Sequence, residues 1–213
     1  GPNSKDIPLP GTDISLIKNL VSDTSVVSSN FNVIGNSSFD NLPISTPVPV
    51  SNYQLVNKKY VDALFNLGIA YYQQKKFPES IKTYDRAIAI NNKIAHFHCN
   101  KAISLYALKK YENALDALQN AINLAPNYKE AWYNKGLCLF ELNKLSESND
   151  SYIEALKIDS TFTDAHYNRG VCLSRMRLHE EAIGSFQNTI SIDQKYLNAY
   201  INNIHSCRKL MHY

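Results

Sequence analysis

The chain has 213 residues, of which 44% are hydrophobic and 19% are charged, and its net charge is +3. These values are ordinary for a globular protein of one or two domains. No block of Lys and Arg stands out, which argues against nucleic acid as a partner. No run of about 18 apolar residues is present, so the sequence predicts no membrane-spanning helix.

The first part of the chain differs in composition from the rest. Residues 1–4 (GPNS) have the look of a scar left by tag removal. Residues 5–58 are rich in Ser, Asn, Val and Pro, with short β-branched runs between turn residues, which predicts an extended or short-stranded segment. The stretch PVSNYQLVNKKYVD, within residues 45–62, resembles a boundary repeat of bacteriophage-type tail-fibre proteins. That resemblance implies a structural virion or fibre component.

From Val61 onward the sequence repeats itself every 34 residues, which defines rows 61–94, 95–128, 129–162 and 163–196 and a closing helix at 197–213. Positions within a row are called columns here, with Val61 in column one. Small residues recur in two columns, and bulky residues fill the columns between them. Small side chains at fixed intervals let two helices approach closely. Column eight holds Gly68, Ala102, Gly136 and Gly170, and column twenty holds Ser80, Ala114, Ser148 and Ala182.

This pattern resembles the tetratricopeptide repeat, a pair of antiparallel helices in 34 residues. The resemblance implies an all-α fold, a right-handed superhelix of helix pairs over residues 59–213, in which stacking of neighbouring pairs supplies the core. One departure concerns column four, which is large and apolar or aromatic in the family. Here it holds Leu64, His98, Trp132 and His166.

Column six carries the same residue in every row: Asn66, Asn100, Asn134, Asn168 and Asn202. In the family the first helix of each pair lines the concave groove, and a column of asparagines is similar to that of the O-GlcNAc transferase superhelix, which implies binding of extended peptides. An amide side chain offers both an acceptor and two donors. With helices about 8–10 Å apart and about 3.3 Å per extended residue, successive asparagines would meet about every third ligand residue. The alternative is a family residue without a ligand.

Two further groups are expected in the same groove. The first is an aromatic wall, formed by Phe65, Tyr72, Tyr106, Tyr133, Phe140 and Tyr167. The second is a basic C-terminal end, formed by Arg175, His205, Arg208 and Lys209. Together they predict a protein or peptide ligand that is extended, mostly apolar and acidic at one end. The alternative is that Arg208 and Lys209 only keep the last helix soluble.

The sequence shows no catalytic constellation, and we expect no enzyme, cofactor or metal. His96 and Cys99 share a helix face, but no further ligand pair follows at a zinc-like spacing. The four cysteines lie 34 to 39 residues apart and form no CxxC pair, which predicts reduced thiols and a cytoplasmic location, with a virion as the alternative.

The expected function is therefore a protein-interaction module without nucleic-acid or membrane partners. One alternative is the substrate-recognition arm of a larger O-GlcNAc-type glycosyltransferase, and another is a structural virion or fibre component. The sequence also suggests self-association through residues 5–58. Residues 43–51 (PISTPVPVS) would lie in the groove of the same chain or of a neighbour, with Val48 and Val50 on Tyr106 and Tyr133.

Overall fold

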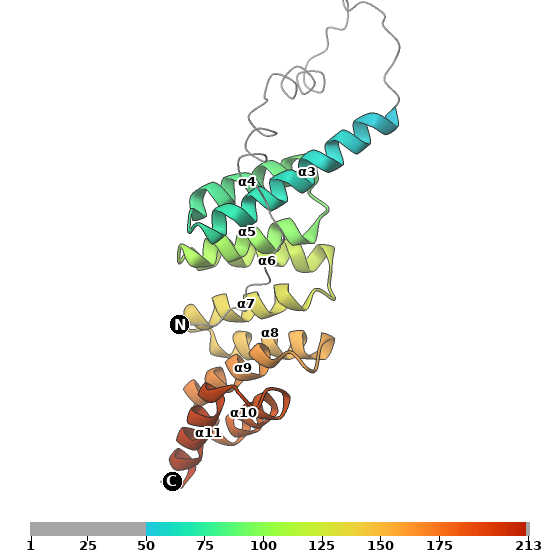
Figure 1. Ribbon diagram of the computed structural model, residues 1–213. Helices are drawn as coiled ribbons and strands as arrows, with labels where there is room; N and C mark the ends of the chain where they lie inside the picture. Colours follow the sequence, from blue (N-terminus) through green and yellow to red (C-terminus); the bar gives the residue numbers. More distant parts are fainter. Residues whose placement is uncertain (1–49, 212–213) are drawn as a thin grey trace, which may run out of the picture. The chain divides into compact units, whose positions relative to one another are not determined.

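The structure, a computed structural model, describes residues 50–211, and residues 50–57 by their backbone alone. Every regular element in this range is an α-helix, which confirms the predicted all-α fold (Figure 1). The chain divides after Ile90 into two units, which are described separately. The first contains α3 (Val50–Gln73) and α4 (Phe77–Ile90). The second contains α5 (Ala95–Ala107), α6 (Tyr111–Leu124), α7 (Lys129–Glu141), α8 (Leu145–Ile158), α9 (Thr163–Arg175), α10 (His179–Ile192) and α11 (Leu197–Leu210).

Helix α3 corrects the prediction for the N-terminal segment. Residues 50–58 were expected to be extended, yet they form the first turns of α3. The physical reason is that no Pro or Gly occurs between Pro49 and Gly68, so nothing interrupts the helix toward its N-terminus. The stretch with the tail-fibre resemblance therefore lies in a helix and not at the end of a β segment. The rest of the segment, including residues 43–49 of the expected groove occupant, lies outside the described residues.

In the second unit the helices form two layers. Each helix packs on the next one in the chain, and contacts also join α5 to α7, α7 to α9 and α9 to α11. The odd-numbered helices therefore form one continuous layer, and α6, α8 and α10 cover its other side (Figure 1). Helices α5, α7 and α9 start at Ala95, Lys129 and Thr163, which reproduces the 34-residue period of the sequence.

The small residues of column eight are explained by the aromatic rings that face them. A Cβ atom on Gly136 would lie 2.5 Å from the ring of Tyr152, and one on Gly170 would lie 2.6 Å from the ring of Phe186. Both rings are fully buried. No Cβ atom tolerates such a distance, so glycine is required wherever a ring occupies the facing position. This confirms that the two helices of a pair approach most closely at column eight.

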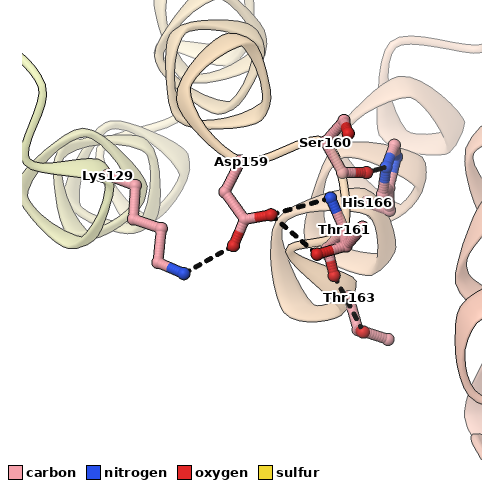
Figure 2. A network of polar contacts seen from close by, with 6 residues as sticks. All are labelled: Lys129, Asp159, Ser160, Thr161, Thr163 and His166. Carbon is pink, nitrogen blue, oxygen red and sulfur yellow. Dashed lines mark hydrogen bonds and ion pairs between the residues drawn. The ribbon is translucent and has the colours of Figure 1, made fainter.

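The unusual residues of column four fasten each helix to the turn before it. The ring nitrogens of His98, Trp132 and His166 lie 3.1, 2.9 and 3.0 Å from the carbonyl oxygens of Asn92, Pro126 and Ser160. Each acceptor is six residues upstream. A carbonyl oxygen only accepts, so each imidazole carries its proton on Nε2. Figure 2 shows this contact for His166 and Ser160. Imidazole and indole thus replace the family's apolar residue without leaving that nitrogen unpaired.

The turns between paired helices use a left-handed residue that is never glycine. Lys75, Lys109, Asn143 and Arg177, all in column fifteen, have φ values of 60°, 60°, 60° and 64°. A side chain in this region is strained because its Cβ approaches the backbone. None of the helices in the described residues is long and apolar enough to cross a membrane.

Candidate functional site

The candidate site is the surface of the odd-numbered helices in the second unit. We use the name odd-helix face for the part of α5, α7, α9 and α11 that carries columns five, six, twelve and thirteen. Contacts between neighbouring odd-numbered helices involve these columns: Tyr133 meets Asn168, and Phe140 meets Arg175. The structure therefore brings Asn100, Asn134, Asn168 and Asn202 onto one continuous layer of helices.

The asparagines bond first to their own helices. The Nδ2 atoms of Asn100, Asn134 and Asn168 donate to the carbonyl oxygens of His96, Glu130 and Asp164, at 2.8, 2.7 and 2.9 Å. Each acceptor lies four residues upstream. This contact explains why a mediocre helix former is tolerated in mid-helix, because the amide uses a backbone group that the helix already presents. It also fixes the amide orientation, with Oδ1 directed away from the bonded carbonyl.

Two asparagines bond in addition to a tyrosine of the preceding repeat. Asn168 Nδ2 donates to Tyr133 Oη at 2.9 Å, and Asn202 Nδ2 donates to Tyr167 Oη at 3.1 Å. Burial, with a smaller contribution from the Asp164 carboxylate, raises the pKa of Tyr133. The Tyr133 hydroxyl therefore stays protonated at neutral pH. These bonds link columns five and six across the boundaries α7–α9 and α9–α11.

The tyrosines are held by aromatic residues that the sequence analysis did not single out. The ring of Tyr133 lies 4.9 Å from that of Phe162, and the ring of Tyr167 lies 4.8 Å from that of Tyr196. Tilted ring pairs at these distances add to stability beyond their burial. Phe162 and Tyr196 are both in column thirty-four, as is Tyr128, which pairs with His96 at 4.7 Å. The recurrence of aromatic residues in that column was the available signal.

Columns twelve and thirteen form a second row of contacts. Tyr106 Oη donates to Glu141 Oε1 at 3.4 Å, and the Arg175 guanidinium lies 5.0 Å from the centre of the Phe140 ring. Burial, followed by the Glu141 charge, raises the pKa of Tyr106. Tyr106 and Phe140 are half-buried, so the expected aromatic wall presents ring edges and not whole rings.

The charges of the odd-helix face are more mixed than the sequence analysis expected. Arg175, His205, Arg208 and Lys209 are exposed at the end formed by α9 and α11, in agreement with the predicted basic end. Acidic residues in columns two and thirteen also lie beside the predicted residues: Glu130, Asp164 and Glu141. Within the described residues, Arg175 forms no ion pair with a carboxylate. Its guanidinium is therefore positioned by the Phe140 ring alone.

Three of the predicted residues lie in the first unit. Phe65 packs on Tyr84, with ring centres 6.2 Å apart, and Tyr72 packs on Phe77 at 5.4 Å. Asn66 is exposed on α3. These residues belong to the α3–α4 pair and are considered with that pair alone.

The cysteines and histidines form no reactive centre in the described residues. Cys99, Cys138 and Cys172 are buried, and all four cysteines are free. Burial raises the pKa of the Cys99 and Cys138 thiols to about 12, so both remain protonated and unreactive at neutral pH. His96 is exposed while Cys99 is buried, so the two do not converge. In the range 50–211 no group of three or more metal-ligating side chains is assembled.

An open hollow of 530 Å³ lies away from the predicted residues. It is formed by the α6–α7 turn, Trp132 of α7 and the C-terminal half of α8. Its lining residues are Pro126, Asn127, Trp132, Glu154, Lys157 and Ile158.

Comparisons with known proteins agree with this architecture. Residues 61–93 and residues 99–161 match two family models that are both described as tetratricopeptide repeat. No curated protein sequence matches the chain. Solved structures that resemble it include the protein MamA, with a TM-score of 0.61 and 20% identity over 70% of this chain and 86% of that one.

Two further similar structures carry descriptions that mention peptides. YrrB, described as a TPR protein with an unusual peptide-binding site, has a TM-score of 0.62 and 16% identity over 77% of this chain and 84% of that one. The first TPR of Spaghetti (RPAP3), solved with the HSP90 peptide SRMEEVD, has a TM-score of 0.54 and 23% identity over 55% of this chain and 93% of that one. At such identities the likeness concerns the fold. With the family matches and the 34-residue helix pairs, it shows that this chain is built from tetratricopeptide repeats.

Proposed function

We propose that the protein is an interaction module whose odd-helix face binds extended segments of other proteins. The observation that carries this proposal is the column of asparagines along α5, α7, α9 and α11. In three of them one N–H is held by the helix itself, which leaves Oδ1 directed away from that helix. An amide oxygen recognises a main-chain N–H whatever the side chains are, so the column suits a general peptide-binding surface.

The dimensions of the helix layer support an extended ligand. Neighbouring packed helices are about 8–10 Å apart, and an extended chain advances about 3.3 Å per residue. Consecutive asparagines would therefore meet about every third residue of the ligand. Two proteins of the same fold carry descriptions of a bound peptide or a peptide-binding site, which is consistent with this use of the fold.

The charges favour a particular orientation of the ligand. Arg175, Arg208 and Lys209 are exposed on α9 and α11, and Arg175 already lies over the Phe140 ring. A guanidinium placed by an aromatic ring keeps its N–H donors for an anion. We infer that the ligand places a carboxylate or acidic side chain at this end and apolar side chains toward Tyr106. The glycosyltransferase-arm and fibre alternatives gain no supporting observation from the described residues.

The test replaces Asn100, Asn134 and Asn168 together by Ala. Alanine is the better helix former, so the repeats should remain folded. Each lost hydrogen bond is worth about 0.5–1.5 kcal/mol, so affinity should fall by a factor between about ten and two thousand. The probe is a peptide selected from a displayed random library on the wild-type protein, and its affinity is measured by calorimetry.

A matched control removes three exposed asparagines from the even-numbered helices: Asn113, Asn120 and Asn188. This control should bind the selected peptide as the wild type does. Unchanged affinity in the first variant, or equal loss in both, would overturn the proposed function.

A further inference from the structure

The asparagines of the odd-helix face are not equivalent, because two of them have given a donor to a tyrosine. Asn168 has two amide protons, and both are used: one on the Asp164 carbonyl and one on the Tyr133 hydroxyl. Asn202 gives one proton to the Tyr167 hydroxyl. Asn168 therefore has no donor left for a ligand. Its Oδ1 has no partner in the described residues, and it is not among the buried polar atoms that lack one.

The donor that the amide has lost reappears on the tyrosine. Tyr133 Oη accepts from Asn168, and its own hydroxyl proton has no acceptor among the described side chains and carbonyls. Tyr167 Oη stands in the same relation to Asn202. A hydroxyl is both a donor and an acceptor, so accepting one bond leaves its proton available. Each pair thus presents a donor and an acceptor oxygen, both next to the same Nδ2 atom.

We propose that Tyr133–Asn168 and Tyr167–Asn202 are two main-chain reading sites, in which the hydroxyl donates to a ligand C=O and Asn Oδ1 accepts from a ligand N–H. This inference rests on the proposed function and assigns to tyrosine the donor role that the asparagine column suggested for the amide. The ligand class follows: an extended segment with free N–H groups at two residues about three apart, since helices lie about 8–10 Å from each other. Proline at either residue is excluded because it has no N–H.

The preceding boundary lacks such a pair. Between α5 and α7, column five holds Cys99, which is buried, and Asn134 bonds only to the Glu130 carbonyl. Asn134 therefore keeps one amide proton and its oxygen for a ligand. Main-chain reading by a hydroxyl is confined to the α7–α9 and α9–α11 boundaries, beside the basic end formed by Arg175, Arg208 and Lys209.

The experiment uses Tyr133→Phe, Tyr167→Phe and the double variant, with the library-selected peptide as the probe. Phenylalanine keeps the ring contacts with Phe162 and Tyr196 and removes only the hydroxyl. At about 0.5–1.5 kcal/mol per hydrogen bond, each single variant should bind about 2- to 12-fold more weakly and the double variant about 5- to 150-fold. Tyr200→Phe, which removes an exposed hydroxyl of α11, should bind as the wild type does.

A second measurement leaves the protein unchanged and edits the ligand. Replacing one peptide amide at a time by an ester removes a single N–H, and on the wild-type protein the affinity should fall at two positions about three residues apart. A scan without two such positions overturns the reading sites, even where a variant fails to fold. Wild-type affinity of the tyrosine double variant, together with weak binding of the asparagine triple variant, overturns this inference and leaves the proposed function standing. If neither variant weakens binding, or no peptide is selected, both are wrong.

Discussion

The neighbouring helix pairs α5–α6 and α7–α8 have helices of the same lengths and occupy successive rows of the period, yet their interiors are built differently. In α7–α8, Gly136 faces the Tyr152 ring and its carbonyl accepts a bond of 2.8 Å from Ser148 Oγ. In α5–α6 the equivalent residues are Ala102, Leu118 and Ala114, all of them buried. The period therefore fixes the volume shared by two facing columns, while leaving open which helix supplies it.

The turns that follow the two pairs differ as well. Asp159 ends α8 and accepts from Lys129 Nζ at 2.5 Å, from Thr161 N at 2.9 Å and from Thr161 Oγ1 at 2.7 Å (Figure 2). Lys129 also lies 5.0 Å from the centre of the Phe162 ring. The equivalent positions in the preceding row are Ala95 and Ala125, which carry no charge. Charge thus supports one turn, while the other relies on its backbone.

The largest expected effect is at the ring contact of α7–α8. Gly136→Val should lower the free energy of unfolding by about 1–3 kcal/mol, because the new side chain overlaps the Tyr152 ring in a packed interior. The measurement is urea denaturation followed by circular dichroism. Combining Gly136→Ala with Tyr152→Leu gives α7–α8 the residues found in α5–α6, and this double variant should be more stable than Gly136→Ala alone.

Gly184 provides the matched control for this prediction. It lies in α10, and a Cβ atom added there would have no neighbour within 4 Å. Gly184→Ala should therefore stabilise the protein by about 1 kcal/mol through helix propensity alone. If Gly136→Ala and Gly184→Ala change stability in the same direction, the ring contact does not restrict column eight.

The next effect concerns the hydroxyl that distinguishes the two interiors. Ser148→Ala removes the buried bond to the Gly136 carbonyl and should cost about 0.5–1.5 kcal/mol in the same urea experiment. Ser146→Ala, at an exposed position of the same helix, should leave stability almost unchanged. Equal effects at the two serines would show that the buried bond contributes nothing of its own.

The turns inside the two pairs predict a smaller gain in stability. Lys109→Gly should stabilise the protein by about 0.5–1 kcal/mol, because relief of left-handed strain exceeds the entropy that glycine adds to the unfolded chain. Asn143→Gly should gain less, since asparagine tolerates this conformation better than lysine. Thermal melts of both variants check the ranking, and a larger gain at Asn143 would contradict it.

The smallest effect is the pH dependence of the Lys129–Asp159 contact. Hydrogen bonds from Lys129 and Thr161 lower the pKa of Asp159 from 3.8 to about 2. A lowered carboxyl pKa means that the contribution is complete above about pH 4 and is lost as pH falls toward 2. The stability difference between the wild type and Asp159→Asn should therefore shrink between pH 5 and pH 2.5. A difference that stays constant over that range would show that the ionised carboxylate contributes no stability.

The sequence by itself determined the repeat architecture and the face that the asparagines share. Helix pairs, the small residues of column eight and the recurrence of column six are all properties of a one-dimensional period, which the chain states four times over. The candidate residues on α5 to α11 could be assigned to one layer for the same reason. Similarly, the basic end was visible because Arg175, Arg208 and Lys209 occupy neighbouring rows.

Only the tertiary structure decided how those residues are used. Whether the second amide proton of an asparagine reaches a tyrosine depends on the residue in column five of the preceding row and on how two helices meet. Asn168 finds Tyr133 there, while Asn134 has Cys99 in the equivalent position. The partners of Tyr133 and Tyr167 in column thirty-four, and the donors exchanged between them and the asparagines, arise from packing across repeats. A period records which residue recurs, whereas a hydrogen bond also requires a distance and a direction, and these exist only in the folded chain.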